Sequence, residues 1–138
     1  MKRVYVAGPY SSCTALGILA NVGTGLRASL AVWKAGYAPY VPWLDILIHI
    51  INPTVAQTTV QECYDWSMAW LEASDAVLVL PGWKKSKGTI AEIARASELG
   101  IPIFYSLAAL NRCFAEPERT ERINRIVSKV KNKSSLRK

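Results

Sequence analysis

The chain contains few of the residues that bind metal ions or form disulfides. Its 138 residues include three cysteines and one histidine. Cys13, Cys63 and Cys113 stand fifty residues apart, and no CxxC pair or Cys/His cluster accompanies them. This spacing indicates neither a zinc site nor a disulfide framework. An odd number of cysteines fits a reducing compartment, so we expect a cytoplasmic protein with no bound metal or cofactor.

Long apolar runs and targeting signals are also missing. The N-terminus enters a predicted strand at Arg3 without the pattern of a signal peptide. The apolar segment from Tyr40 to Ile51 is too short to cross a bilayer, and it contains Asp45 and His49. We therefore expect no membrane-spanning segment and no membrane partner.

Acidic residues are fewer than basic residues in this chain. Seventeen lysines and arginines against ten acidic residues give a net charge of +7, and basic residues dominate from Arg119 to Lys138. Such a tail can contact nucleic acid, but we favour a solvated helix with a frayed end. At 51% hydrophobic residues, the chain can bury one core. We expect residues 1–130 to form a single domain and residues 131–138 to be a basic, disordered tail.

Apolar runs bounded by turn residues predict alternating strands and helices. The predicted strands are Arg3–Ala7, Tyr37–Val41, Asp75–Leu80 and Ile101–Tyr105. The predicted helices are Val22–Ala35, Trp43–Ile51, Thr59–Ser74, Thr89–Leu99, Leu107–Phe114 and Pro117–Val130. In the first of these helices, Leu26, Leu30 and Trp33 share one face. The polar segment Asn52–Thr59 could form a loop over a pocket.

This alternation predicts a parallel sheet with right-handed crossovers. We expect an α/β fold, a flavodoxin-like or Rossmann-like three-layer sandwich with a four- to five-stranded sheet. The first strand would lie between the second and the third, so the switch point lies between strands one and three. The loop Gly8–Ser12 and the segment Pro81–Glu92 would meet there.

The segment Asp75–Glu92 carries the clearest functional pattern. Its apolar run, Ala76–Leu80, is typical of a buried parallel strand and ends at Pro81-Gly82. Ser86–Thr89 then offers hydroxyls and backbone N–H groups at a helix start, a natural place for an anion. Glu92 lies just inside that helix. Open α/β sheets place their chemistry at this end of a parallel strand.

Several segments, by their order and spacing together, resemble the nucleoside 2-deoxyribosyltransferase-like superfamily. The matching segments are Val4–Ser11, Gly36-Tyr37 with Pro39 and Pro42, Trp70-Leu71 ahead of Ser74–Ala76, Ser86–Thr89 with Glu92, and Ala96 with Gly100–Pro102. They span residues 2–105, most of the chain. The loop Leu80–Trp83 is similar to that of a small branch of uncharacterised proteins from bacteria and phages.

The resemblance implies an enzyme that cleaves or transfers the N-glycosidic bond of nucleosides or nucleotides. The family's nucleophile is a Glu in a Gly-x-x-x-Glu helix start, which matches Gly88 and Glu92 here. The tyrosine of the family's first strand matches Tyr5, which would lie beside the nucleophile. The anomeric carbon develops oxocarbenium character as the base leaves, so a carboxylate can stabilise or capture it.

The resemblance also implies a substrate class. Six residues before the Glu, the family's transferases have an Asp that contacts the sugar 5′-hydroxyl, and its nucleotide hydrolases have a Ser that contacts the 5′-phosphate. This chain has Ser86 there, between Lys85 and Lys87. A Ser at a helix start can donate to a phosphate, which an Asp would repel. The pattern favours a nucleoside 5′-monophosphate, with simple N-capping by Ser86 as the alternative.

One position departs from the family. The family usually has an Asp three residues before the Trp-Leu pair, and this chain has Ser67 there. Asp65 lies two residues earlier, and a helix would turn it about 200° away. Either the helix start is irregular and Asp65 serves as the catalytic acid, or the acid is missing and activity is weak, different or absent.

The predicted substrate-binding residues come mainly from the two loops at the switch point. They are Gly8, Pro9, Tyr10, Ser11, Asp45, Trp83, Ser86, Gly88 and Thr89. Trp83 could stack on a base or pack over the sheet edge. Asp45 follows the second strand, where the family often binds the base, and His49 one turn later is more simply a structural histidine. Asp75 is expected to cap or orient the sheet edge.

The leading hypothesis is an N-glycosidase that acts on a nucleoside 5′-monophosphate with a standard or modified base. A nucleoside 2-deoxyribosyltransferase is the close alternative. A nucleotide-binding protein without catalysis and a nucleic-acid-associated protein that uses its basic tail are the others. The expected partners are a small-molecule nucleotide or nucleoside and further copies of the chain, because the family is usually dimeric or larger.

Overall fold

The computed structural model describes residues 1–45 and 59–115. The chain divides into two compact units, Met1–Leu107 and Ala108–Lys138. Residues 107–115 are helical, which agrees with the helix predicted there. The predicted last helix, Pro117–Val130, and the predicted tail, residues 131–138, lie outside the described residues.

A parallel sheet forms the centre of the unit Met1–Leu107. Its strands are β1 (Arg3–Ala7), β2 (Ala38–Tyr40), β3 (Ala76–Val79) and β4 (Ile103–Phe104). They lie in the order β2-β1-β3-β4, and every pair of neighbours is parallel. The predicted α/β fold, with its first strand between the second and the third, is therefore confirmed with four strands.

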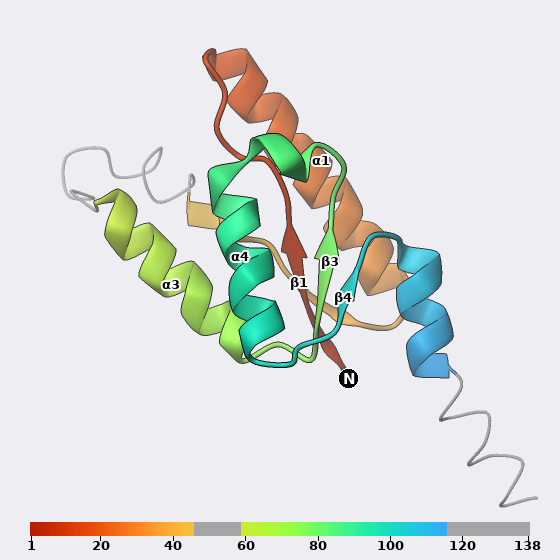
Figure 1. The fold of residues 1–138 in the computed structure, drawn as a ribbon. Coiled ribbons are helices and arrows are strands. Elements are labelled where there is room, and N and C mark those ends of the chain that lie inside the picture. Colours follow the sequence, from red (N-terminus) through yellow and green to blue (C-terminus); the bar gives the residue numbers. More distant parts are fainter. Residues whose placement is uncertain (46–58, 116–138) are drawn as a thin grey trace, which may run out of the picture. The chain divides into compact units, whose positions relative to one another are not determined.

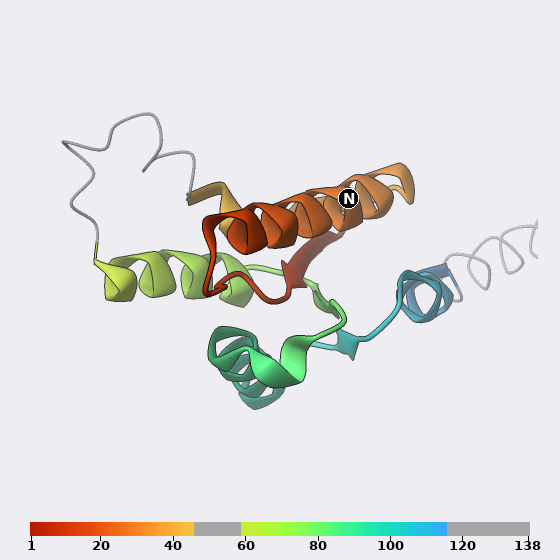
Figure 2. The same cartoon turned by 90° about the horizontal axis from the view of Figure 1, so that it is seen from above.

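Helices cover both faces of this sheet (Figures 1 and 2). The helix α1 (Ala15–Lys34) packs against β1 and β2 on one face, and α4 (Lys87–Glu98) packs against β1, β3 and β4 on the other. The helix α3 (Val60–Glu72) lies beside α4. Short 3-10 helices, η1 (Pro42–Leu44) and η2 (Trp83–Lys85), follow β2 and β3. The arrangement is the predicted three-layer sandwich.

The two central strands form the core because both of their faces are covered. Residues 4–7 of β1 are fully buried, and residues 76–79 of β3 are at most 5% exposed. On the face that α3 and α4 cover, Tyr5 and Val77 pack with Leu71 of α3 and Ala96 of α4. Burial of a large apolar side chain contributes about 1.5–3 kcal/mol, so these residues fix the sheet on which the loops rest.

Capping residues set the starts of the helices beside the sheet. Thr59 accepts a hydrogen bond from the backbone N–H of Glu62 at 3.2 Å, and the Glu62 carboxylate accepts one from the Thr59 N–H at 2.6 Å. This reciprocal capping box has the Thr-x-x-Glu pattern that is typical of a helix start. The helix α4 begins at Lys87, two residues before its predicted start, because Ser86 is its N-cap.

Two predicted segments after β2 lie mostly outside the described residues. Of the short helix predicted over Trp43–Ile51, the structure describes the 3-10 turn Pro42–Leu44 and Asp45. His49 and residues 52–58 of the predicted pocket loop are not among the described residues.

The start of α1 differs from the sequence prediction, and its most apolar face is not the buried one. The helix begins at Ala15, seven residues before the predicted start, because the Thr14 side chain caps it by accepting from Gly17 N. Leu26, Leu30 and Trp33 share a face as predicted, but that face is exposed. The buried positions of α1 are Gly25 and Val32. Glycine at position 25 lets the Trp43 ring approach the backbone of α1. Apolar periodicity does not reveal this contact.

The helix α1 is the one described helix that passes a test of length and composition for a membrane span, a test that a helix of a soluble protein can also pass. Over an 18-residue window its mean hydropathy is 1.4, and its 20 residues have the length and composition of a membrane span. Only 11% of that window is buried in the structure. The sequence prediction considered continuous apolar runs, and polar residues interrupt this segment, so the expectation of no membrane partner stays a prediction.

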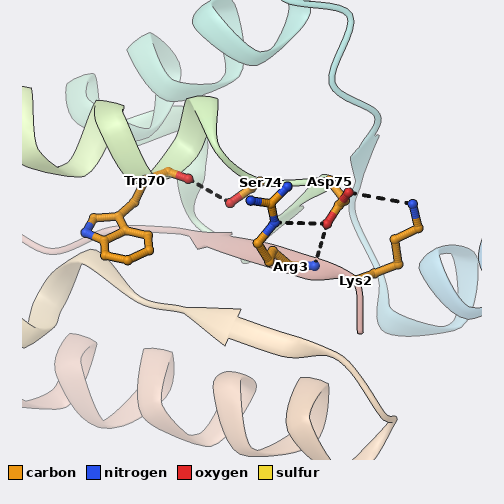
Figure 3. A network of polar contacts seen from close by, with 5 residues as sticks. All are labelled: Lys2, Arg3, Trp70, Ser74 and Asp75. Atoms are coloured by element: carbon orange, nitrogen blue, oxygen red, sulfur yellow. Dashed lines mark hydrogen bonds and ion pairs between the residues drawn. The ribbon is translucent and has the colours of Figure 1, made fainter.

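Asp75 fixes the entry of β1 beside β3 (Figure 3). Its carboxylate accepts from the Arg3 backbone N–H at 2.7 Å and from Arg3 Nε at 3.3 Å, and it pairs with Lys2 Nζ at 3.6 Å. The backbone hydrogen bond from Arg3 is the main reason why the pKa of this carboxyl lies below its usual value. Asp75 therefore orients the sheet edge as the sequence predicts.

Candidate functional site

A pocket of about 750 Å³ opens at the carboxyl end of the sheet. It lies where the loop after β1 meets the segment after β3, which is the switch point that the strand order predicts. The residues lining it are Gly8, Pro9, Tyr10, Ser11, Pro42, Trp43, Asp45, Val60, Cys63, Tyr64, Ser67, Lys85, Ser86, Lys87, Gly88, Thr89 and Glu92.

Glu92 is the buried acid of this pocket. It lies in the second turn of α4, and its side chain is 7% exposed. Its Oε1 accepts a hydrogen bond of 2.7 Å from the Tyr5 hydroxyl, while Oε2 is buried with no hydrogen-bond partner among residues 1–45 and 59–115. Burial raises the pKa of the carboxyl to about 7, against the opposing effect of the Tyr5 hydrogen bond.

Tyr5 reaches Glu92 because β1 is the second strand of the sheet and α4 crosses its face. The Tyr5 side chain is fully buried, and both this burial and the charge of Glu92 raise the pKa of the phenol. Its ring lies 5.7 Å from that of Tyr40 on β2, which stacks on Trp70 of α3 at 5.0 Å. This aromatic row holds the Tyr5 hydroxyl at the carboxyl group.

The first turn of α4 gives the pocket a positive end. Ser86 Oγ accepts from the Thr89 backbone N–H at 3.3 Å and from Thr89 Oγ1 at 2.9 Å, so the predicted N-cap is present. In a helix the first backbone N–H groups have no intrahelical acceptor, and here Lys87 and Gly88 of the first turn line the pocket. Lys85 and Lys87 are also among the lining residues and carry positive charge.

Two glycines allow close approaches at the mouth of the site. A Cβ on Gly88 would lie 2.7 Å from the Tyr64 hydroxyl, so only glycine lets α3 approach the first turn of α4 this closely. A Cβ on Gly8 would lie 3.0 Å from Leu80 Cβ, at the end of β3. The loop after Gly8 is held by Asn21 of α1, whose Nδ2 donates to the carbonyl oxygen of Tyr10 at 3.1 Å.

The opposite wall comes from the segment after β2. Trp43 is 1% exposed, and its six-membered ring packs directly on the backbone of α1 at Gly25, where a Cβ would overlap it. Asp45 lines the same wall. Burial and then the negative charge of Asp45 raise the pKa of the phenols of Tyr10 and Tyr40, the latter to about 12.

Three predicted site residues are not in the pocket lining: Tyr5, Asp65 and Trp83. Tyr5 lies behind Glu92 and reaches the site through its hydrogen bond to that carboxyl. The helix α3 is regular from Val60 to Glu72, so the Asp65 side chain is exposed and accepts from Gln61 Nε2 at 2.8 Å. Trp83 packs on the core with its ring 5.7 Å from Tyr105, which is the sheet-edge alternative. Ser67 is 7% exposed and lines the pocket at the position where the family usually has an acid.

Sequence reasoning missed most of the residues that α3 contributes. Val60, Cys63, Tyr64 and Ser67 recur at helical spacing and all line the pocket. This i, i+3, i+4, i+7 stripe was a usable signal, although periodicity alone does not say whether it faces a core or a ligand. Trp43 was also missed.

The family of the chain follows from the sequence over residues 26–105. This stretch matches the model of a protein family described as a domain of unknown function, DUF4406, and it is more than half of the chain. The chain belongs to the DUF4406 family. No curated protein sequence matches it.

A solved structure shows the same fold as this DUF4406 protein. It is a 2-deoxyribosyltransferase from the psychrotolerant bacterium Bacillus psychrosaccharolyticus, with a TM-score of 0.54 and 15% sequence identity. The likeness covers 73% of this chain and 69% of the other. It confirms the deoxyribosyltransferase-like fold that the sequence resemblance predicts, and at this identity it shows the fold alone.

The DUF4406 pocket combines three chemical features. It offers a buried carboxyl with one open oxygen, a helix N-terminus with two lysines, and a wall that carries an indole and a carboxylate. Among the described residues, no group of three His, Cys, Asp or Glu side chains could hold a metal ion. Such an arrangement can place an electrophilic carbon at Glu92 while an anionic group binds at α4.

Proposed function

We propose that the protein hydrolyses the N-glycosidic bond of a nucleoside 5′-monophosphate, with Glu92 as the nucleophile. The observation that carries this proposal is the open oxygen of a buried carboxyl in the same pocket as a positive helix start. Tyr5 holds the other oxygen at 2.7 Å, so the carboxyl has one fixed orientation. A fixed carboxylate is suited to attack on an anomeric carbon.

The proposed reaction has two steps. Glu92 Oε2 bonds to the anomeric carbon as the carbon–nitrogen bond breaks, and the electron pair leaves with the base, which takes up a proton. Water then attacks the anomeric carbon of the glycosyl ester, loses a proton and releases the sugar 5-phosphate and the Glu92 carboxylate. Ser67 stands where the deoxyribosyltransferase-like superfamily usually has an acid. Solvent therefore supplies the proton that the departing base takes up.

The monophosphate is assigned from the first turn of α4. The Ser86 hydroxyl accepts from Thr89 and keeps its own proton to donate. Lys85, Lys87 and Gly88 line the same pocket, so this helix start brings backbone N–H groups and two positive charges to it. Charge-assisted hydrogen bonds from such donors favour a phosphate over a neutral hydroxyl.

Two other functions have specific support. Likeness to a 2-deoxyribosyltransferase favours transfer of the deoxyribosyl group to a second base. Ser67 at the position of the family's acid favours a nucleotide-binding protein without turnover. Addition of an acceptor base distinguishes a transferase from a hydrolase, because only a transferase then forms a new nucleotide. Tight nucleotide binding without release of base identifies a binding protein.

The proposal is tested by incubating the protein with ribo- and deoxyribonucleoside 5′-monophosphates of the common bases and scoring free base by chromatography. We expect one or a few of them to release base and sugar 5-phosphate in equal amounts. The corresponding nucleosides should react more slowly. Absence of free base from the whole panel, with or without an acceptor base, would refute an N-glycosidic activity on these substrates.

A further inference from the structure

Trp43 carries a hydrogen-bond donor that the described part of the protein does not use. The side chain lines the pocket and is 1% exposed. Its indole Nε1–H is buried and has no hydrogen-bond partner within residues 1–45 and 59–115. An unpaired buried donor lowers stability, and buried indole N–H groups usually have a partner. A ligand in the pocket could supply the acceptor.

The packing of Trp43 defines which way the donor faces. The edge of the six-membered ring, from Cε3 to Cη2, lies against Gly25 on α1. Nε1 belongs to the five-membered ring on the other side of the indole, so it faces away from α1. Because a side chain on Gly25 would overlap the ring, the indole lies in direct contact with the backbone of α1.

Trp43 lines the pocket from the side of the sheet that α1 covers. It packs on α1, which covers one face of the sheet, whereas Ser86 and Glu92 belong to α4 on the other face. A nucleotide has its sugar between the phosphate and the base. With the phosphate at the start of α4 and the anomeric carbon at Glu92, the base extends toward Trp43.

We propose that Trp43 Nε1–H donates a hydrogen bond to the base of the substrate and selects bases with an acceptor atom at that position. The acceptor is a ring nitrogen or a carbonyl oxygen. This inference rests on the proposed function and adds a specificity-determining residue to it. A site built around a buried donor rejects an analogue that lacks the acceptor, because the donor is then left unpaired.

The direct test follows the indole proton by NMR. The Glu92→Gln variant, which cannot turn the ligand over, is labelled with ¹⁵N and titrated with the nucleoside 5′-monophosphate panel. The chain has five tryptophans, and Trp43→Phe identifies the signal of Trp43. We expect this signal to move downfield and its proton to exchange more slowly on binding, while the exposed Trp33 and Trp66 do not respond.

The same titration separates failure of this inference from failure of the proposed function. If the amides of Gly88 and Thr89 respond to a nucleotide and the Trp43 indole does not, the inference is wrong and nucleotide binding stands. A Trp43 proton that is already protected in the ligand-free protein would also overturn it, because the chain itself then supplies the acceptor. If no nucleotide binds, both the function and the inference fail.

A second experiment removes the donor or the acceptor separately. Benzothienylalanine at position 43 keeps the shape of the indole and replaces N–H by sulfur. For the base that binds best, analogues lacking one ring nitrogen or one carbonyl oxygen are compared with the parent nucleotide. We expect the wild-type protein to bind one analogue about five- to tenfold more weakly.

The substituted protein should bind the parent as weakly as that analogue and should not distinguish the two. Trp66→Phe, a change at an exposed tryptophan outside the pocket, should retain the wild-type preference. Full affinity and unchanged discrimination in the benzothienylalanine protein would refute the hydrogen bond.

Discussion

At the scale of single residues, the ionisation of Glu92 decides what the pocket can do. Burial raises its pKa from the usual 4.5 to about 7, and the hydrogen bond from Tyr5 acts in the opposite direction. Near neutral pH the carboxyl is therefore divided between its ionised and protonated forms. Only the ionised form can attack a carbon atom. The burial that orients the nucleophile also limits the fraction of it that is active.

This balance predicts the pH dependence of base release. We expect kcat/KM to rise with pH and to reach half of its maximum near pH 7, because the carboxyl must lose its proton to react. Tyr5→Phe removes the hydrogen bond that lowers the pKa of Glu92, so its midpoint should lie at a higher pH. A profile that is flat from pH 5 to 9, or a midpoint that Tyr5→Phe leaves in place, would contradict this role of Glu92.

A substitution at Ser86 tests the predicted choice of monophosphate. Asp is as good an N-cap as Ser, so Ser86→Asp should keep α4 and place a negative charge where the phosphate is expected. We expect the wild-type protein to bind monophosphates more tightly than nucleosides, and Ser86→Asp to reverse this order. Calorimetric titration measures both affinities.

Ser86→Asn is the matched control, because it caps the helix without adding a charge and should keep the preference for monophosphates. A wild-type protein that prefers nucleosides would refute the phosphate assignment and favour the transferase.

How much of the site could be predicted depends on how local each signal is. Glu92 and Ser86 could be chosen from the sequence because a helix start fixes their spacing within one segment. Their roles stay predictions, but the structure places both in the pocket. Asp65 could not be excluded beforehand, because its exposure depends on the phase of α3. The contact between Trp43 and Gly25 joins two distant segments and left no local pattern.

At the scale of elements, α1 packs on a face that its apolar periodicity does not indicate. Leu30 and Trp33 share the more apolar face, yet the sheet and the Trp43 ring pack on the side of Gly25 and Val32. Apolar periodicity identifies the more hydrophobic face of a helix. On α1 the contact face is instead the one that carries Gly25, because glycine leaves room for the Trp43 ring. In contrast, the capping box at Thr59 was predictable because it lies within four residues.

Alanine substitutions at two glycines of α1 should have opposite effects on stability. A Cβ at position 25 would overlap the Trp43 ring, so Gly25→Ala should lower the free energy of unfolding by about 1–3 kcal/mol. At position 23 a Cβ would lie 3.3 Å from the mobile end of Arg27, so Gly23→Ala should raise it by up to about 1 kcal/mol through helix propensity. Urea denaturation measures both, and equal effects would show that Trp43 does not pack as described.

At the scale of the whole molecule, the fold was predictable because alternating apolar runs and turn residues determine a parallel sheet. The strand order, the three layers and the position of the switch point all agree with the prediction. The apolar content of α1 was not recognised, although this helix exposes Leu16, Leu19 and Trp33. Residues that the structure describes do not test the expected homodimer or larger oligomer.

The basic end of the chain gives a prediction from sequence alone, since residues 116–138 lie outside the described part. Residues 131–138 contain Leu136 as their one apolar side chain, so they can bury little surface. Deletion of Lys131–Lys138 should change the free energy of unfolding by less than about 1 kcal/mol and leave pocket binding unchanged. It should weaken binding to nucleic acid in filter assays at low salt. A large fall in melting temperature would contradict the prediction that residues 131–138 are a disordered tail.

The control for the central experiment is the stability of Glu92→Gln. A carboxyl whose pKa is about 7 when folded and about 4.5 when unfolded stabilises the fold below pH 4.5 and loses that contribution as pH rises through 7. The neutral amide avoids this loss. We therefore expect Glu92→Gln to be at least as stable as the wild-type protein at pH 8, by urea denaturation, so loss of activity would not reflect unfolding.

The central claim is that Glu92 attacks the anomeric carbon of a nucleotide. Its most direct test is the rate of base release by the wild-type protein and by Glu92→Gln, measured at pH 8 on the best substrate of the monophosphate panel. The account predicts at least about a thousandfold slower release by the variant, with nucleotide binding retained. Release at the wild-type rate by a folded Glu92→Gln protein would contradict it.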